Sequence, residues 1–425
     1  MIKEKEYKNR RKKLLSKLSK NSVCIIFSAQ NKTRSNDTQY PYRQDSDFYY
    51  LTGFKEDNSA LVFVKNKNKS KVILFVQEKN KELELWTGKR LGTKKAKEQF
   101  DIDEVFASKD INKKMKKYIG NSKSLYCDLK SSNKKVKKII SLSKSLKNHD
   151  NISSLIGKMR LIKSKNEIKI IQKAINITTE AHHYAMSRKK IGKREYELQA
   201  EIEYIFKKNG AYSDAYTSIV ACGDSANTLH YISNNKILIN YELILIDAGC
   251  EYEYYASDIT RTIPVNGKFT PAQKDIYQLV LDTQIKIIKM IKPNIKRTKL
   301  QKETEKLLTK GLVKLGILKG SVKKLLKKKK HKAYYPHGIG HWMGLDVHDK
   351  APYLDENKKE IVLKKGMVLT IEPGLYLNKD DKNIPKKYRG IGIRIEDDIL
   401  ITKGGYRNLS SNIVKTIKDI EEYSN

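Results

Sequence analysis

The sequence has 425 residues, of which 39% are hydrophobic, and 87 Lys and Arg against 48 Asp and Glu give a net charge of +39. This length favours two domains, and the sequence contains no apolar run of about 18 residues, which disfavours a membrane span. The positive excess is mostly lysine and is spread along the chain, which indicates a compositional bias rather than a dedicated nucleic-acid-binding arm. Its densest run, Lys323–Lys332, is interpreted as a solvated helix end or loop rather than a localisation signal.

The N-terminal segment is charged and amphipathic. Leu14, Leu15 and Leu18 have helical spacing, and the apolar core of a secretory signal is missing. The four cysteines lie far apart in the sequence and form no CxxC pair, which disfavours structural zinc and indicates reduced thiols. We therefore expect a cytoplasmic protein. An inert packed thiol is favoured for Cys250, with a reactive thiol beside a candidate ligand strand as the alternative.

Short β-branched runs alternate with helical patterns in the first part of the chain. Three runs bounded by polar turn residues predict strands: Val23–Ser28, Ala60–Val64 and Val72–Val76. Helical patterns lie around Lys94–Phe100 and Asp110–Ile119. The alternation predicts an α/β domain over residues 1–155, ending in a polar stretch, Ser131–Ser154, that contains little that must be buried.

The second part opens with a long amphipathic pattern, Ser164–Ser187, in which Ser164 and Glu167 form a capping box. Three further helices are predicted: Arg194–Lys208, Pro271–Ile291 and Thr298–Leu315. Strands are predicted at Tyr216–Cys222, Leu243–Gly249, Ser257–Val265, Met367–Glu372, Gly392–Glu396 and Ile399–Thr402. This order predicts an α+β domain over residues 156–425, with helices outside an antiparallel sheet.

Two aspartates lie on neighbouring predicted strands. Asp247 ends an apolar strand, and Asp258 lies eleven residues further on. If the turn centres between Tyr252 and Glu253, the aspartates face each other across an antiparallel pair, with their Cβ atoms about 5 Å apart. Carboxylates this close repel each other unless a cation lies between them, so the pair indicates a metal site. The alternative is two polar residues at strand ends.

Three of the eight histidines lie in the segment HGIGHWMGLDVH, as His337, His341 and His348. Pro336 and the glycines argue against a helix there. A turn or strand leaves one imidazole free to bind a metal and the others free to bind substrate. The alternative is a satisfied polar cluster near Trp342.

Two glutamates, Glu372 and Glu396, each follow a strand of large apolar residues, where a charge pointing into the core requires a partner. Arg394 shares a strand face with Glu396 and could hold a neighbouring carboxylate. Either glutamate alone could equally be a surface residue at a sheet edge. Two Asp, one His and two Glu together form an oxygen-rich set suited to Mn²⁺ or Mg²⁺, and such a set can hold two ions about 3.5–4 Å apart. His230 and His348 are then natural outer donors.

The ordered set resembles the metal signature of the pita-bread metallopeptidases, which include methionine aminopeptidase, prolidase and aminopeptidase P: Asp247, Asp258, His341, Glu372 and Glu396. The segments HGIGHWMGLDVHD, YPYRQDSDFYYLTGF (Tyr40–Phe54) and LWTGKRLG (Leu85–Gly92) resemble the aminopeptidase P branch. The resemblance thins between Asp101 and Ser154. It implies an α/β N-terminal domain of the aminopeptidase P type and an α+β pita-bread (creatinase/aminopeptidase-like) catalytic domain.

The resemblance implies hydrolysis of the peptide bond between an N-terminal residue and a following proline, by a hydroxide that bridges two divalent ions, most often Mn²⁺. It gives Asp247 to one ion, Asp258 and Glu396 to both, and His341 and Glu372 to the other. The further catalytic residues that it implies are His230, His337, His348 and Arg394. Tyr376 would bind substrate and support Arg394. Trp86 would cap the substrate site of a neighbouring subunit, which implies a dimer or tetramer.

Two other functions compete with this interpretation. A prolidase limited to Xaa-Pro dipeptides would have the same ligands, but the N-terminal match favours longer proline-containing peptides. A nucleic-acid-binding protein on the same scaffold fits the net charge, but it would not require five intact ligands. We therefore expect a metalloaminopeptidase without a specific nucleic-acid or membrane partner.

Overall fold

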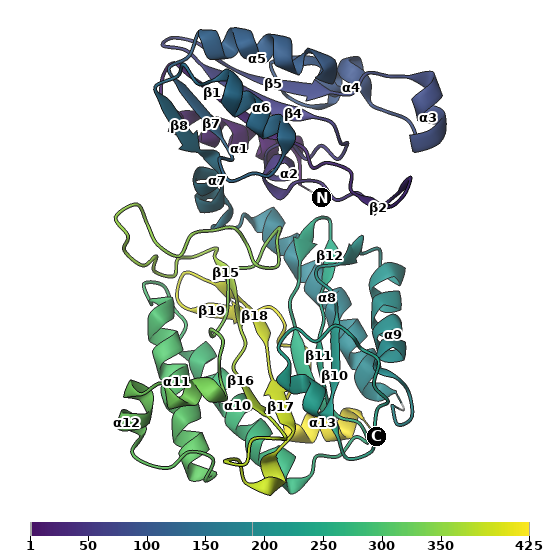
Figure 1. The fold of residues 1–425 in the computed structure, drawn as a ribbon, viewed down its shortest axis with the longest axis vertical. Helices are drawn as coiled ribbons and strands as arrows, with labels where there is room; N and C mark the ends of the chain where they lie inside the picture. The colour runs from purple at the N-terminus through teal and green to yellow at the C-terminus, as the bar shows by residue number, and fades with distance from the viewer. Residues whose placement is uncertain (1, 189, 425) are drawn as a thin grey trace. The chain divides into compact units, whose positions relative to one another are not determined.

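The computed structural model describes residues 2–188 and 190–424, and the chain forms two compact units, Met1–Arg160 and Leu161–Asn425 (Figure 1). The sequence-based division after residue 155 falls inside α7 (Ile152–Arg160), which packs against elements of the first unit. Among the described residues, none of the helices has both the length and the apolar character needed to cross a bilayer.

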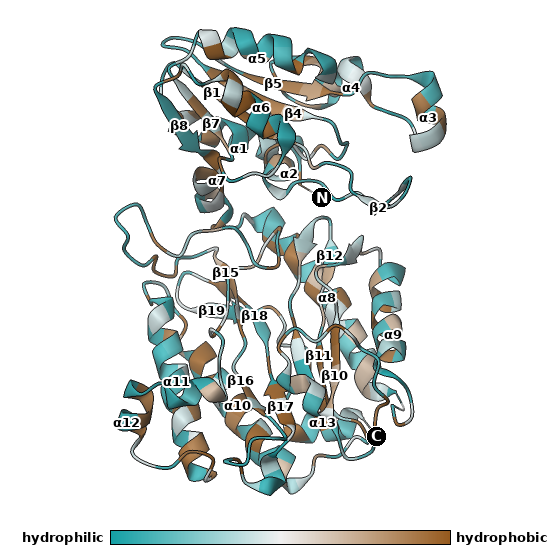
Figure 2. Ribbon diagram, in the orientation of Figure 1, coloured by the Kyte–Doolittle hydropathy of each residue, from teal (hydrophilic) through white to brown (hydrophobic). Residues whose placement is uncertain are grey.

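The first unit is built on one mixed sheet with the strand order β6-β5-β4-β1-β7-β8. Its strands are β1 (Ser22–Phe27), β4 (Ala60–Lys65), β5 (Ser70–Val76), β6 (Glu104–Ala107), β7 (Ser124–Cys127) and β8 (Asn148–Asn151), with a small hairpin of β2 (Thr33–Ser35) and β3 (Thr38–Gln39). Its other helices are α1 (Glu4–Lys17), α2 (Ser46–Thr52), α3 (Lys81–Thr87), α4 (Gly92–Gln99), α5 (Ile111–Gly120) and α6 (Lys134–Leu142). The inner strands β1, β4 and β5 are apolar in Figure 2, and the predicted α/β class is confirmed, each predicted element lying within two residues of its observed bounds.

The polar stretch Ser131–Ser154 is more ordered than its composition suggested. It forms α6, β8 and the start of α7, and β8 extends the sheet beyond β7 in parallel. Val136 and Ile139 of α6 enter the hydrophobic core. A helix covering a sheet needs apolar residues on one face only, so a few of them suffice in a lysine-rich segment.

The second unit surrounds short strands with helices (Figure 1). The helices are α8 (Lys165–Ser187), α9 (Glu195–Lys208), α10 (Pro271–Lys289), α11 (Arg297–Lys314), α12 (Val322–Lys327) and α13 (Ile417–Tyr423). The predicted capping box is present, with the Ser164 hydroxyl accepting from the Glu167 N–H, and Thr270 caps α10 in the same way. The lysines from Lys323 to Lys330 are exposed, as expected for a solvated segment.

The strands of the second unit pair antiparallel, which confirms the predicted α+β class. They are β9 (Ser213–Asp214), β10 (Ile219–Cys222), β11 (Leu243–Asp247), β12 (Cys250–Tyr252), β13 (Tyr255–Ala256), β14 (Thr260–Pro264), β15 (Val368–Ile371), β16 (Gly374–Leu377), β17 (Ile391–Arg394), β18 (Asp397–Ile401) and β19 (Tyr406–Asn408). The sheet orders are β10-β11-β14, β13-β12-β9, β15-β18-β19 and β16-β17. The candidate ligands Asp247, Glu372 and Glu396 therefore lie at or just beyond the ends of β11, β15 and β17.

The predicted register between the two aspartates is wrong. Asp247 pairs with Thr260, and Asp258 lies just before β14. The turn is at Glu253 and Tyr254, whose φ angles of +48° and +69° are left-handed, so its centre lies one residue later than expected. A later turn moves every cross-strand partner two residues along, which separates the aspartates from direct pairing.

His182 on α8 is a buried histidine whose protonation opposes folding. Its Nε2 lies 3.2 Å from the Ala248 carbonyl oxygen, and burial, followed by the charge of Arg261, lowers the pKa of His182 to about 4. The unfolded chain has a histidine pKa of about 6.5. The unfolded state therefore binds the proton first, and stability falls as the pH drops from about 6.5 to about 4, on the order of 3 kcal/mol in all. We expect His182→Gln to lack this part of the pH dependence in urea unfolding. If the unfolding free energy of the variant and of the wild type depended on pH in the same way, the assignment to His182 would be contradicted.

Candidate metal centre

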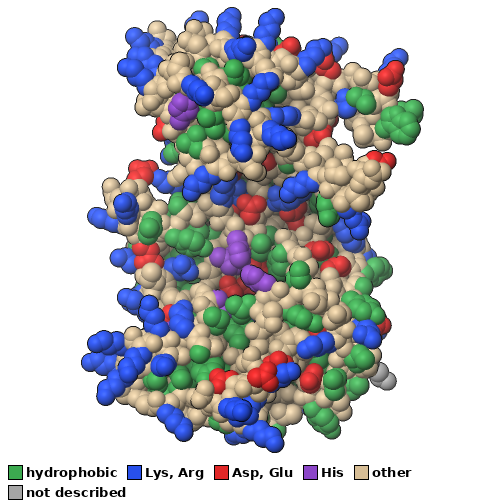
Figure 3. Space-filling view, in the orientation of Figure 1, with side chains coloured by type: hydrophobic (Ala, Val, Ile, Leu, Met, Phe, Trp, Pro, Cys, Tyr) green, Lys and Arg blue, Asp and Glu red, His purple; other side chains and the backbone are tan. Residues whose placement is uncertain are grey.

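One cavity of the second unit, about 570 Å³ in volume, collects nearly all the candidate residues. In Figure 3 histidine side chains gather in a hollow of this unit, with acidic side chains beside them. The five candidate ligands line the cavity together with the other predicted polar residues: Asp247, Asp258, His341, Glu372, Glu396, His230, His337, His348 and Arg394. Residues as far apart in the sequence as His230 and Glu396 therefore share one site.

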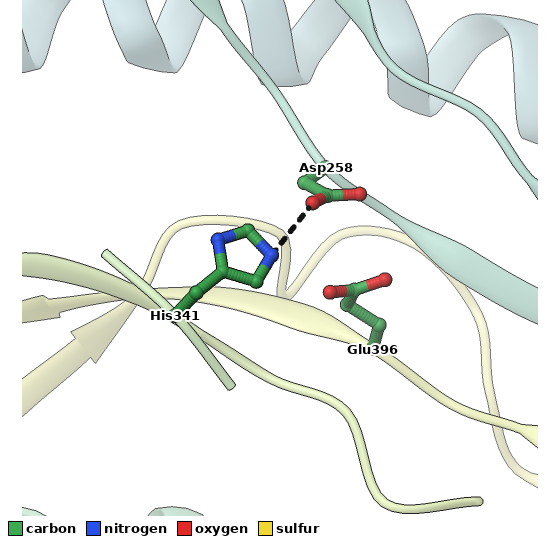
Figure 4. Close-up of side chains that lie close together, drawn as sticks. All are labelled: Asp258, His341 and Glu396. Carbon is green, nitrogen blue, oxygen red and sulfur yellow. Dashed lines mark ion pairs between the residues drawn. The ribbon is translucent and has the colours of Figure 1, made fainter. Parts of the chain in front are cut away.

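Three candidate ligands converge most closely. One ligand atom each from Asp258, His341 and Glu396 lies within 4.8 Å of the others (Figure 4). The His341 Nε2 is 3.2 Å from the Asp258 Oδ2 and 3.8 Å from the Glu372 Oε1. Asp258 and Glu396 are nearly inaccessible to solvent, at 4% and 2% exposure. Two carboxylates and an imidazole held this way form a ligand set of the kind that divalent cations bind.

The backbone fixes which nitrogen of His341 faces the carboxylates. The His341 Nδ1 lies 3.1 Å from the Trp342 carbonyl oxygen, which can only accept a hydrogen bond. The Nδ1 therefore carries a proton, and the Nε2 is the nitrogen turned toward Asp258 and Glu372, where it could bind a cation.

Arg394 connects a carboxylate to the histidine side of the cavity. Its Nη2 donates to the Asp247 Oδ2 at 2.5 Å, and its Nη1 donates to the Tyr376 hydroxyl at 2.9 Å. That hydroxyl lies 2.8 Å from the His337 Nε2, while the His337 Nδ1 faces the Gly338 carbonyl oxygen at 2.8 Å. The Nδ1 must then donate, and Tyr376 donates to the Nε2. Burial, followed by the charge of Arg394, lowers the pKa of His337 to about 4, so this ring is neutral.

Tyr216 was missed in the sequence analysis, although it joins the two aspartates. Its hydroxyl lies 2.6 Å from both the Asp247 Oδ1 and the Asp258 Oδ1. Burial and these two negative charges raise the pKa of Tyr216 well above its usual value. Tyr216 precedes β10 and belongs to no motif, so no sequence signal distinguished it.

Thr260 and Asp398 also support the ligands and were not predicted. The Thr260 hydroxyl donates to the Glu396 Oε2 at 2.8 Å, and the Asp398 Oδ2 accepts from the Asp258 N–H at 3.1 Å. The available signal for Asp398 was the run of three consecutive acids from Glu396 to Asp398, the last two of which begin the buried strand β18. Adjacent strand residues face opposite sides, so these side chains cannot all be solvated there.

The carboxylates of the site repel one another. Burial, and then the charges of Asp258 and Glu372, raise the pKa of Glu396 well above its usual value. Burial also raises the pKa of Glu372 to about 7, although His341 and Arg394 oppose the shift. The pKa of His341 rises to about 9, because the hydrogen bond and charge of Asp258 outweigh the effect of burial. A divalent cation among these groups would relieve the repulsion, so the donor set fits a metal.

Two glycines bring backbone segments together around the ligands. A Cβ on Gly249 would lie 1.9 Å from the Ser257 carbonyl oxygen, and one on Gly340 would lie 1.9 Å from the Thr370 carbonyl oxygen. Gly249 thus lies against the segment that leads to Asp258, and Gly340 holds the histidine segment against β15. Any side chain would force these segments apart.

Apolar side chains form much of the remaining cavity wall, and two histidines stand at its exposed edge. Ile219, Leu229, Ile232 and Val347 contribute the apolar side chains. His230 and His348 are exposed, and the His348 ring lies 4.0 Å from the His341 ring between centroids.

Trp86 and the cysteines take no part in this cavity. Trp86 lies on α3 of the Met1–Arg160 unit, is 84% exposed and does not line the cavity. The four cysteines are buried free thiols, and burial raises the pKa of Cys250 to about 11, which favours the packed thiol over a reactive one.

Comparison with protein-family models gives two matches. The model of metallopeptidase family M24 matches residues 169–403, and the model of the aminopeptidase P N-terminal domain matches residues 7–126. Together they span most of both compact units.

Individual relatives match over almost the whole chain. An Xaa-Pro aminopeptidase of Haemophilus influenzae is 40% identical over 422 residues, covering 99% of this chain and 97% of the relative. An Xaa-Pro aminopeptidase of Escherichia coli is 39% identical, with the same coverage of both chains. Human Xaa-Pro aminopeptidase 3 is 34% identical, covering 98% of this chain and 85% of the relative.

Solved structures agree in fold. Proline aminopeptidase P II from Yersinia pestis superposes with a TM-score of 0.95 at 38% identity, covering 100% of this chain and 99% of that one. Escherichia coli aminopeptidase P with the inhibitor Pro-Leu gives the same TM-score and identity, covering 100% of this chain and 98% of that one.

Proposed function

Because the chain belongs to metallopeptidase family M24 and is an Xaa-Pro aminopeptidase, we propose that its cavity holds two divalent metal ions, Mn²⁺ being the preferred metal. The observation that carries this proposal is the group of four mutually repelling carboxylates that faces the Nε2 of His341 in one cavity. We assign the ions to Asp247, Asp258, His341, Glu372 and Glu396. Bound there, the ions supply Lewis-acid polarisation of the scissile carbonyl and a water of lowered pKa.

The surrounding residues orient these ligands and the substrate. Arg394 holds Asp247, and Tyr216 holds both aspartates, so the carboxylates keep their positions while the peptide binds. We propose that His348, whose ring lies beside that of His341, donates a ring N–H to the developing oxyanion, and that the exposed His230 contacts the substrate backbone. The neutral ring of His337 lines the cavity beside Tyr376, where we place the proline residue.

Peptides longer than two residues are the proposed substrates. A tripeptide Xaa-Pro-Xaa and the dipeptide Xaa-Pro should be compared, each with Mn²⁺ and with a chelator. We expect the tripeptide to be cleaved after its first residue with Mn²⁺, and at least about 100-fold less with the chelator. Cleavage of the dipeptide alone would make the protein a prolidase, against the relatives described above, and full activity in chelator would contradict the metal mechanism. Replacing Mn²⁺ by Zn²⁺, Co²⁺ or Mg²⁺ in the same assay tests the preferred ion.

The proposed assembly is a dimer or tetramer. Helix α3 has no buried residue, and its Leu85 and Trp86 are 82% and 84% exposed. Apolar side chains exposed to this degree on one short helix favour burial against a second copy of the chain. The four buried free thiols support a reducing compartment, the cytoplasm.

A further inference from the structure

A buried ion pair lies behind the histidine segment of the cavity. The Lys163 Nζ lies 2.9 Å from the Asp349 Oδ2, and both side chains are only 1% exposed. Lys163 lies between α7 and α8, and its backbone N–H donates to the Gly366 carbonyl oxygen. Asp349 directly follows His348. Neither residue lines the cavity, so neither can touch the substrate there.

Asp349 is connected to His341 through a single carbonyl oxygen. The Asp349 N–H donates to the Trp342 oxygen at 2.7 Å, and the same oxygen accepts from the His341 Nδ1 at 3.1 Å. This bond closes the loop from Trp342 to Asp349, which carries His348. The position of Asp349 therefore sets the position of the acceptor that orients His341.

The loop also contacts the segment that leads to Asp258. The Gly344 carbonyl oxygen accepts from the Ala256 N–H at 2.9 Å. A Cβ on Gly344 would lie 2.5 Å from the Asp349 Oδ2 and 3.0 Å from the Lys163 Cε, so the loop packs directly on the ion pair. The ion pair thus supports the histidine side of the site through two backbone hydrogen bonds of this loop, one to the Trp342 oxygen and one to the Gly344 oxygen.

We propose that Lys163 and Asp349 are positioning residues that hold the rings of His341 and His348 in their working orientation. The inference rests on the proposed function, since it treats His341 as a metal ligand. A buried ion pair contributes little net stability compared with apolar residues of the same volume, because desolvation offsets the attraction. The directional geometry of the ion pair, by contrast, fixes the loop from Trp342 to Asp349. In other metal sites, the hydrogen-bonding partners of the ligands orient those ligands in the same way.

Three variants test the proposal: Lys163→Met, Asp349→Asn and the double variant that carries both. Each single variant removes one charge of the buried ion pair and should lose stability, whereas the double variant removes both charges and should recover much of it. We expect kcat for an Xaa-Pro-Xaa peptide to fall about 10–100-fold in all three, and Mn²⁺ affinity, measured by calorimetry on the metal-free protein, to fall by a similar factor. KM should change by less than about threefold.

Lys190→Met is the matched control, because Lys190 is an equally buried lysine of the same unit that donates to the Met186 carbonyl oxygen and does not line the cavity.

A purely structural ion pair would give a different pattern. The double variant would then regain wild-type kcat and Mn²⁺ affinity together with its stability, and that result would overturn the proposal. If a single variant fails to fold, the double variant alone decides. An active Asp258→Asn variant would instead overturn the proposed metal site. A failure of the positioning proposal can therefore be distinguished from a failure of the proposed function.

Discussion

Replacing Asp258 by alanine should remove nearly all hydrolysis of Xaa-Pro-Xaa peptides. Asp258 lies 3.2 Å from the His341 Nε2 and shares a cluster with Glu396, so its loss removes a proposed ligand of both ions. Loss of an outer partner of a metal ligand costs about 10–100-fold, and loss of the ligand itself should exceed that. The measurement is kcat/KM at saturating Mn²⁺, together with the number of ions retained after dialysis.

The control for this variant is Asp282→Asn on α10, where an exposed aspartate accepts from Gln278 and does not line the cavity. Both variants should retain the wild-type circular dichroism spectrum. Activity of Asp258→Ala within tenfold of wild type, with the control also active, would rule out the two-metal mechanism.

Replacing Arg394 by methionine should lower both activity and stability. The guanidinium binds Asp247, Tyr376 and Thr260 at once, through its Nη2, Nη1 and Nε atoms. Methionine leaves the buried Asp247 carboxylate without its charged partner, which should cost about 3–5 kcal/mol of unfolding free energy in chelator, where no metal ion compensates. Activity should fall about 10–100-fold, because Asp247 and Tyr376 lose their common anchor.

Arg394→Lys separates charge from geometry at the same position. A lysine ammonium cannot reproduce the planar fork that reaches three partners, so this variant should regain part of the stability but little of the activity. Arg188→Met removes an exposed arginine with a comparable bond to the Tyr184 hydroxyl and should leave both quantities near wild type. Wild-type activity in Arg394→Lys would show that a positive charge at this position is enough for activity and that the guanidinium geometry is not required.

The sequence predicted the elements well where local signals were strong. Ser164 and Thr270 have side chains that can cap a helix, and both helices start there in the structure. The turn at Glu253 and Tyr254 has no Asn-Gly signal, and tertiary contacts determine it, so the register of Asp247 was predicted wrongly.

The sequence predicts the site residues that belong to recognisable motifs, and it does not predict those that lie outside them. Residues in recognisable segments, such as His341 and Glu396, could be proposed from residue type and context. Tyr216 and the pair of Lys163 and Asp349 act through distances that only the folded chain creates, across 31 to 186 positions of sequence. Solvent exposure, as for Trp86, is likewise a property of the folded chain.

The glycines at positions 249 and 340 set the spacing of backbone segments at the candidate metal centre, and this spacing does not depend on the surface residues. At both positions, the distance between neighbouring segments is set by backbone against backbone, with no side chain between them. Most lysines are exposed, so a chain with a net charge of +39 can carry them on its surface without widening the gap between the candidate ligands. Mutational tolerance in this protein should therefore be high across its exterior and close to zero at two residues that have no side chain.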